Sequence, residues 1–188
     1  MTATPTTGFR WTIADLALFE SDRANRHEII DGELFVTRAP TWQHQTVCIN
    51  IGTLLKLWSD KSGLGEVAFT PGIIFSESDN VIPDLVWVSH KKLKELLDQA
   101  GHLTGAPELV IEVLSPGDKN QQRDTDAKRK LYSAQGAKEY WIVDFQRQVV
   151  AVYRREKAVL KLVVTLYGED ELTSPLLPDF KCLIGEFF

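Results

Sequence analysis

The sequence predicts a single α/β domain, in which a mixed β-sheet is flanked by helices and antiparallel strands lie near both ends. Short apolar segments rich in β-branched residues alternate with segments that have helical spacing of apolar residues. A tight-turn signature stands near the amino terminus, and two strand-like segments follow each other near the carboxyl terminus. The length of 188 residues and the 44% hydrophobic content suffice for one core, so we expect one domain over residues 11–188.

The amino terminus is expected to be a short disordered tail over residues 1–10. Its first residues, MTATPTTG, have neither the basic start nor the apolar stretch of a secretion signal. The longest apolar candidate, residues 109–114, is far shorter than the roughly 20 residues of a membrane-spanning helix. Cys48 and Cys182 form no disulfide framework and are expected to be buried thiols. We therefore expect a cytoplasmic protein without a membrane partner.

The first half of the chain predicts a hairpin followed by the main core helix. A short helix capped by Thr12 comes first. Residues 27–37, HEIIDGELFVT, place two β-rich arms around Asp31-Gly32, a pair typical of two-residue hairpin turns. Residues 41–61 carry apolar side chains on one helical face, so we expect the longest helix there.

Two strands and a short helix are expected next. Residues 66–75 alternate but contain Pro71-Gly72, which favours a strand that bends or lies at an edge. Residues 81–88 predict a second, more apolar strand. Residues 90–99 have the apolar spacing of a short amphipathic helix.

The second half of the chain predicts buried strands around one polar helix. Residues 108–114, ELVIEVL, and residues 139–144, EYWIVD, are apolar on both faces, as in the middle of a sheet. Residues 119–135 predict a helix between them. Its residues expected to face inward are Ala127, Leu131 and Ala134. Residues 149–154 and 160–167 predict an antiparallel pair, and the tail through Phe188 is expected to pack on the body.

Two acidic residues stand inside apolar strand-like segments. Asp84 lies in VIPDLVWV and Glu112 in ELVIEVL. A buried, ionised carboxylate needs a base, hydrogen bonds or a cation, and one cation satisfies both residues if their strands are neighbours. Oxygen ligands with few protein groups suit Mg²⁺, for which Mn²⁺ is the expected substitute. The histidines and cysteines have no zinc-site spacing. The net charge of −5 excludes binding of nucleic acid through the whole surface, so any such contact is local.

These residues resemble the PD-(D/E)xK signature, with Pro83-Asp84 on one strand and Glu112 on the next. The resemblance extends to HEIIDGEL, to the helix entry at residues 41–44, and to the long block PELVIEVLSPGDKNQQRDTDAKRKLYSAQGAKEYWIVD. Over nearly the whole chain, the sequence is similar to the Uma-type bacterial family of endonucleases. The resemblance implies a restriction-endonuclease-like fold and metal-dependent hydrolysis of phosphodiester bonds, in DNA rather than RNA.

One position departs from the wider superfamily, because Leu114 stands where the third motif residue would be lysine. The resemblance implies a replacement lysine on the following helix, where the spacing D-x-x-x-K-x-x-x-Y falls on Asp124, Lys128 and Tyr132. Lys128 is the preferred residue. Lys130 lies about 200° further around a helix, so it is the fallback and cannot share a site with Lys128.

The resemblance also implies roles for Glu28 in the hairpin and His44 at the start of the core helix. Glu28 is expected to add a carboxylate at or beside the metal, and His44 to meet a phosphate. The catalytic set is therefore Asp84, Glu112, Lys128 and Glu28, with His44, Lys130 and Asp124 in support.

Structural roles remain as alternatives for each of these residues. Asp84 also fits an exposed bend, and Glu112 also fits a strand residue paired with a core Lys or Arg. Lys128 also fits a solvated helix face, Glu28 an exposed hairpin position and His44 a helix cap or packing residue. The alternative function is a non-catalytic nucleic-acid-binding or structural domain that keeps the nuclease fold. A homodimer is expected because two sites cut two strands most simply.

Overall fold

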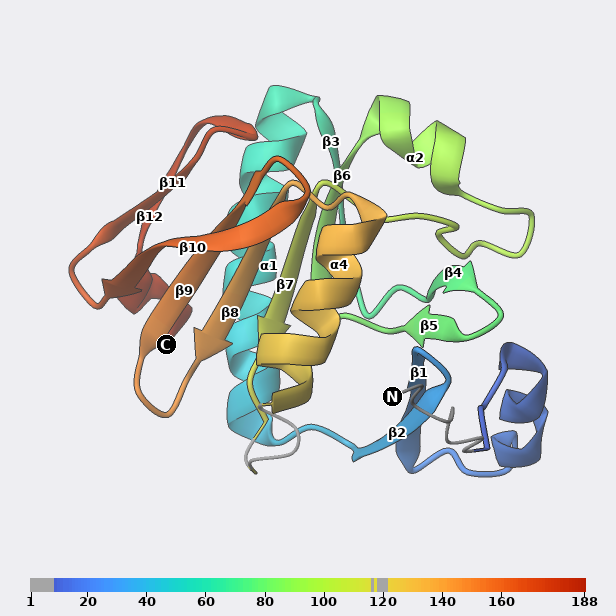
Figure 1. Ribbon diagram of the computed structural model, residues 1–188. Helices are drawn as coiled ribbons and strands as arrows, with labels where there is room; N and C mark the ends of the chain where they lie inside the picture. The colour runs from blue at the N-terminus through green and yellow to red at the C-terminus, as the bar shows by residue number, and fades with distance from the viewer. Residues whose placement is uncertain (1–8, 116, 118–121) are drawn as a thin grey trace, which may run out of the picture.

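The structure, a computed structural model, describes residues 9–115, 117 and 122–188. Its centre is a six-stranded sheet in the order β10-β9-β8-β7-β6-β3, in which only β7 and β8 run parallel (Figure 1). The strands are β3 (Gly65–Phe69), β6 (Leu85–Ser89), β7 (Leu109–Val113), β8 (Glu139–Asp144), β9 (Val149–Glu156) and β10 (Val159–Tyr167). The two strands predicted for the middle of the sheet, β7 and β8, lie there.

A second sheet of four strands, in the order β2-β1-β5-β4, lies beside the carboxyl end of β7. It consists of β1 (Asn25–Ile30), β2 (Glu33–Arg38), β4 (Ile73–Ser76) and β5 (Asp79–Val81). The predicted hairpin is confirmed: β1 and β2 pair antiparallel, and both Asp31 (φ 50°) and Gly32 (φ 73°) have positive φ. A third sheet pairs β11 (Glu171–Ser174) with β12 (Leu177–Leu183).

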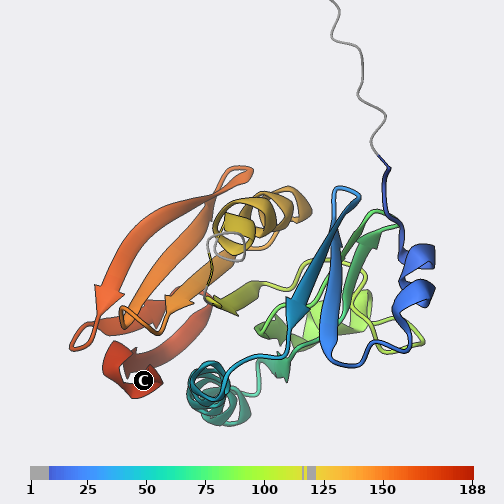
Figure 2. The ribbon, with the colours of Figure 1, turned by 90° about the horizontal axis from the view of Figure 1, so that it is seen from below.

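Helices cover both faces of the central sheet. Figure 2 shows α1 (Trp42–Ser62) on one side and the helix that ends as α4 (Arg129–Gln135) on the other. Each face has its own apolar core, one against α1 and the other between α4 and the small sheet. The remaining helices are η1 (Ile13–Phe19), α2 (His90–Leu96), η2 (Arg123–Lys128) and η3 (Ile184–Phe187).

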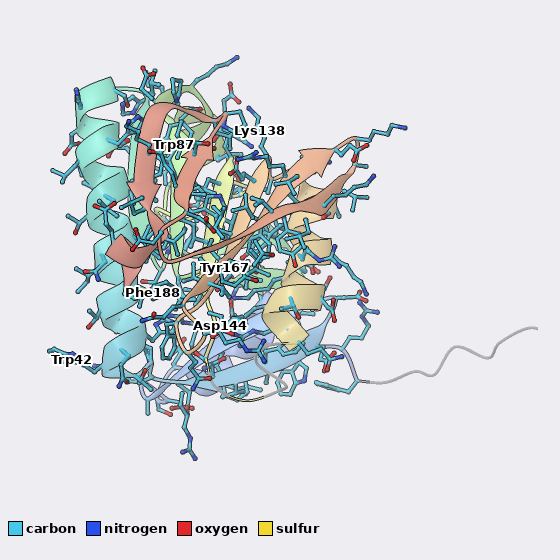
Figure 3. All side chains as sticks on the ribbon, turned by 90° about the vertical axis from the view of Figure 1, so that its left-hand side faces the viewer. Trp42, Trp87, Lys138, Asp144, Tyr167 and Phe188 are labelled. Carbon is cyan, nitrogen blue, oxygen red and sulfur yellow. The ribbon has the colours of Figure 1, made fainter. Side chains whose placement is uncertain are left out.

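The core helix begins and ends where the sequence predicts. Thr41 accepts a hydrogen bond from the amide of His44, and Gly63 ends the helix with φ 66°. Its buried face carries Val47, Ile51 and Leu55. Figure 3 shows Trp42 projecting from the other side of the helix, where its side chain is exposed.

Two predicted strands are each divided in the structure. Residues 66–75 form the end of β3 and, after a turn at Thr70 (φ 48°), β4 in the other sheet. Residues 81–88 leave the small sheet after β5 and enter the central sheet at β6. Pro71 and Pro83 lie in these two breaks, since proline has no N–H for a ladder hydrogen bond. Asp84 therefore lies in the junction between the two sheets.

The helix predicted over residues 119–135 differs in form. Residues 119–121 lie outside the described residues, as do residues 1–8 of the predicted tail. The chain then forms the π-helix η2 and continues as α4, which ends at Gly136 (φ 90°). The prediction that Ala134 faces inward is wrong, because the inward face is centred on Lys128 and Tyr132, both fully buried. A π-turn holds an extra residue and shifts the phase of the faces.

The other predicted features of the body are confirmed. β9 and β10 form the antiparallel pair, Phe187 is buried, and Cys48 and Cys182 are buried free thiols. Within the described part of the chain, no helix is both long and apolar enough to cross a membrane.

Candidate active site

Asp84 and Glu112 lie on neighbouring segments at the junction of the two sheets. β6 and β7 pair with Leu85 opposite Ile111, so one further step brings Asp84 beside Glu112. Both carboxylates are buried, and both border one small cavity of about 20 Å³. Side chains from β7, from β1 of the hairpin and from η2 meet here, joined by the ion pairs of Lys128 with Glu112 and Glu28. The exposed-bend alternative for Asp84 is therefore wrong.

Asp84 has a different set of partners on each oxygen. Oδ2 accepts a hydrogen bond from the amide of Val113 at 3.0 Å and lies 3.2 Å from His44 Nε2. Oδ1 lies 3.2 Å from the Arg26 guanidinium. Burial raises the pKa of Asp84, but the hydrogen bond from His44 and the charges of its neighbours lower it to about 2. Asp84 is thus an anion.

Lys128 lies between Glu112 and Glu28. Its Nζ is 2.8 Å from Oε1 of each glutamate, and its side chain is fully buried. The alternative of a solvated Lys128 is therefore wrong. The ion pair between Lys128 and Glu112 also agrees with the alternative in which Glu112 pairs with a core lysine. Tyr132 donates a further hydrogen bond to Glu112 Oε1 at 3.2 Å.

Glu28 is fully buried, so the exposed alternative for this residue is wrong. Its Oε1 also accepts a hydrogen bond from the amide of Ile82 at 2.7 Å. Its Oε2 is buried without a hydrogen-bond partner among the described residues, with Arg123 NH1 3.6 Å away. Burial raises the pKa of Glu28, but the charges of Lys128 and Arg123 lower it below its ordinary value.

Asp124 joins the same group from η2. Its carboxylate accepts two hydrogen bonds from Arg123, at 2.8 and 3.2 Å, and lies 3.8 Å from Lys128. Arg123 also donates to Thr37 on β2 at 2.6 Å, which ties the helix to the hairpin. A π-helix is rare and is often found at functional sites.

Lys130, the fallback, is exposed and lies on the other side of the helix from Lys128. Two arginines of the site, Arg26 and Arg123, were missed by sequence reasoning. Arg26 precedes Glu28 by two residues on one strand, so both side chains point to the same face. That spacing was the available signal. For Arg123 only its adjacency to Asp124 was available.

The chain matches a known protein family over nearly its whole length. Residues 13–185 match the family model Uma2, described as "Putative restriction endonuclease". The chain belongs to the Uma2 family. Among solved structures, a crystal structure described as a "putative nuclease belonging to DUF820", from Anabaena variabilis, aligns with a TM-score of 0.70 at 15% identity. The alignment covers 86% of this chain and 89% of the other, and it shows a shared fold. Among curated proteins, no sequence matches.

The buried site of this Uma2 chain holds more negative than positive charge. Among the described residues, four carboxylates form ion pairs with only three permanent cations in this buried group. The carboxylates are Glu28, Asp84, Glu112 and Asp124, and the cations are Arg26, Arg123 and Lys128. Burial and the neighbouring carboxylates raise the pKa of Glu112 to about 8, although Lys128 opposes the shift. The excess charge therefore attracts either a proton or a cation.

His44 lies deeper in the Uma2 site than a helix cap requires. Its Nε2 lies 3.0 Å from the carbonyl oxygen of Val113, and its Nδ1 lies 3.6 Å from Cys48 Sγ. His44, Cys48 and Asp84 offer ligand atoms within 4.8 Å of one another. Burial raises the pKa of the Cys48 thiol far above its ordinary range, which disfavours the thiolate that soft metals need.

The residues present fit a hard divalent cation. Asp84 and Glu112 supply oxygen donors beside one cavity, and Glu28 lies behind them, joined to Glu112 through Lys128. The excess negative charge supplies the electrostatic attraction that such a cation needs.

Proposed function

We propose that this protein is a metal-dependent endonuclease that hydrolyses phosphodiester bonds in DNA. One observation carries the proposal: Lys128 reaches Glu112 and Glu28 at 2.8 Å each, inside the buried group that contains Asp84. We assign Lys128 to the lysine position of the PD-(D/E)xK constellation, which it would fill from the helix rather than from the strand. Membership of the Uma2 family and the nuclease-like fold support the same activity.

Asp84 and Glu112 are the residues proposed to hold Mg²⁺, with Mn²⁺ as its substitute. A bound divalent cation lowers the pKa of water and offsets the charge that develops on a phosphodiester. Asp84 is suited to this task because its low pKa keeps it anionic at neutral pH. Glu112 becomes fully available once its proton leaves.

Lys128 and Glu28 act beside these ligands. Burial lowers the pKa of Lys128, but the charges of Glu112 and Glu28 raise it above its ordinary value, so the amine is cationic. The ammonium fixes both glutamates in position and is proposed to orient the attacking water. Glu28 is proposed to assist by holding Lys128 and Arg123, and Asp124 and His44 hold Arg123 and Asp84 in place.

The proposed substrate follows from the border of the cavity. Three arginines, Arg26, Arg38 and Arg123, line it together with the site carboxylates. They offer local contacts to phosphates, as the acidic net charge requires. The family description favours DNA over RNA. We further propose a single domain over residues 11–188 that acts in the cytoplasm as a homodimer.

The activity is tested with purified protein, Mg²⁺ or Mn²⁺, and supercoiled or linear DNA. The parent is expected to nick and cut only with metal, and Asp84→Asn and Glu112→Gln to do neither. Lys130→Ala is the matched control for Lys128→Ala, because it removes a lysine from the exposed side of the same helix. If Asp84→Asn and Glu112→Gln cut as well as the parent, the proposed site is wrong.

A second candidate is a non-catalytic domain that keeps the fold. The observation that favours it is that each site carboxylate already has a basic partner, Arg26 for Asp84 and Lys128 for Glu112. Binding of DNA without cleavage under any metal, with no rise of melting temperature at millimolar Mg²⁺, would support this candidate.

A further inference from the structure

We infer that Arg26 is an exchangeable counter-ion, which holds Asp84 until a divalent cation binds and then turns its guanidinium to a phosphate of the substrate. This inference rests on the proposed function and assigns to it a residue that competes with the metal and binds the substrate in turn. It starts from the single ion pair between Arg26 NH1 and Asp84 Oδ1 at 3.2 Å.

The two oxygens of Asp84 differ in how firmly they are held. Oδ2 receives the amide of Val113 and lies against His44, both of which are buried. Among the described residues, Oδ1 is paired with Arg26 alone. A cation that binds Asp84 therefore approaches through Oδ1, where it meets the guanidinium. Two positive charges at one oxygen repel each other, so one must leave.

Arg26 is also the most loosely held cation of the site. Lys128 is fully buried between two glutamates, and Arg123 is held by Asp124, Glu28 and Thr37. Arg26 has one contact to a carboxylate and one hydrogen bond to the carbonyl of Ile82 at 3.0 Å. Its side chain is 23% exposed. Displacement of Arg26 therefore costs less than displacement of either other cation.

Open space next to Arg26 allows its guanidinium to move away from Asp84. The residue lines the cavity beside Asp84 and also an open groove of about 490 Å³. A planar guanidinium with five N–H donors is matched to a phosphate, which it binds in bidentate fashion. When Arg26 moves from Asp84 to a phosphate, the guanidinium keeps an anionic partner, and the metal takes the position that it leaves beside Asp84.

The test measures metal affinity and DNA affinity in the same variants. Mg²⁺ binding is measured by calorimetry, and binding of a short fluorescent duplex by anisotropy, without metal and with Ca²⁺ in place of Mg²⁺. Gel analysis after each titration confirms that the duplex is intact. Arg26→Gln is expected to bind Mg²⁺ about tenfold tighter or more, because a unit charge at this range shifts carboxylate equilibria by about one to three log units.

DNA binding should change in the opposite direction. Without metal, Arg26→Gln should match the parent, since Arg26 is held by Asp84. With Ca²⁺ it should bind the duplex several-fold more weakly. Arg26→Lys keeps the charge and should leave Mg²⁺ affinity near that of the parent. Arg38→Gln, an exposed arginine at the same border, should weaken DNA binding equally with and without metal and leave Mg²⁺ affinity unchanged.

Damage to the fold cannot imitate this result, because it weakens metal binding rather than strengthening it. If the parent binds Mg²⁺ and Asp84→Asn does not, but Arg26→Gln has unchanged or weaker Mg²⁺ affinity, the inference is wrong while the metal site stands. If the parent binds no Mg²⁺, or Asp84→Asn binds it as well as the parent, the proposed metal site fails and the inference fails with it.

Discussion

Two buried glutamates on the adjacent parallel strands have opposite surroundings. Glu139, at the start of β8, receives hydrogen bonds from Trp141 Nε1 and Ser174 Oγ at 2.8 Å each, with Arg154 Nε 3.5 Å away. Glu112, near the end of β7, shares Lys128 with Glu28 and lies near two further carboxylates. Both residues are 1% exposed.

The difference separates a structural glutamate from a functional one. Neutral donors and a nearby arginine satisfy each oxygen of Glu139, so its burial costs little and asks for no ligand. Glu112 lies near other carboxylates whose negative charge the neighbouring basic residues do not fully neutralise. This arrangement favours the binding of a cation. Its position at the carboxyl end of a strand is also the side where α/β sheets commonly bind ligands.

The largest expected difference between the two glutamates is in activity. Glu112→Gln should reduce metal-dependent DNA cleavage by more than about a hundredfold, because loss of mere outer partners of metal ligands already costs 10- to 100-fold. Glu139→Gln should cut at the rate of the parent when assayed well below its melting temperature. Initial rates on supercoiled DNA measure both. An equal loss of cleavage rate in the two variants would contradict the assignment of Glu112 as functional and Glu139 as structural.

The basic partners should differ in their contribution to stability. Lys128→Met leaves two buried glutamates without their shared cation and should lower the free energy of unfolding by about 3–5 kcal/mol. Arg154→Ala should cost under about 1 kcal/mol, because its side chain is a third exposed. Urea denaturation at neutral pH without metal compares them. A Lys128 variant as stable as the parent would mean that the lysine is not needed to neutralise the cluster.

Hydrogen bonding should make Glu139 the more sensitive residue to an amide substitution. Glu139→Gln turns one acceptor oxygen into an NH2 donor, which then faces either Trp141 Nε1 or Arg154 Nε, both donors only, and should cost about 1–3 kcal/mol. Glu112→Gln relieves repulsion between carboxylates and should cost less in the absence of metal. The opposite order of the two unfolding free energies would contradict the description of the two sites.

Glu112 should also make the stability of the folded protein depend on pH. The pKa of Glu112 is raised from about 4.5 in the unfolded chain to about 8 in the folded protein. Its protonated form therefore adds stability that is complete below pH 4.5 and is lost as the pH rises through 8. Glu112→Gln should flatten this decline between pH 5 and 8, measured as urea denaturation at several pH values without metal.

Metal should reverse the same decline, since Mg²⁺ and a proton compete for one carboxylate. The rise in melting temperature with Mg²⁺ should be larger at pH 8 than at pH 6. A rise that is equal at both values, or larger at pH 6, would show that Glu112 does not bind the metal.

Much of the fold could be predicted because it depends on local patterns. The Asp31-Gly32 turn, the apolar face of α1 and the two-sided apolar strands β7 and β8 each follow from a few neighbouring residues. The passage of the chain from one sheet to the other at Pro71 and Pro83 could not be predicted. It depends on which sheet edges are open for pairing in three dimensions. The π-turn of η2 could not be predicted either, because no residue pattern in the sequence indicates it.

The site was predictable where a charge stood in an apolar strand. Glu112 was found in this way, and Asp84 was found for the same reason although it lies in a sheet junction. Glu139 stands at the start of an equally buried strand, and only the partners that come from β9, β11 and β8 itself reveal that it is satisfied. For Arg26 and Arg123 the sequence offered only the spacing to Glu28 and the adjacency to Asp124, and tertiary contacts are what separate them from the other arginines.

The most direct test of the central claim is a crystal structure of the parent protein soaked in Mn²⁺, with anomalous data to locate the ion. We predict one peak within about 2.0–2.3 Å of carboxylate oxygens of both Asp84 and Glu112. A peak bound by Asp84 with His44 and Cys48 instead, or no peak near Glu112 at saturating Mn²⁺, would contradict the account.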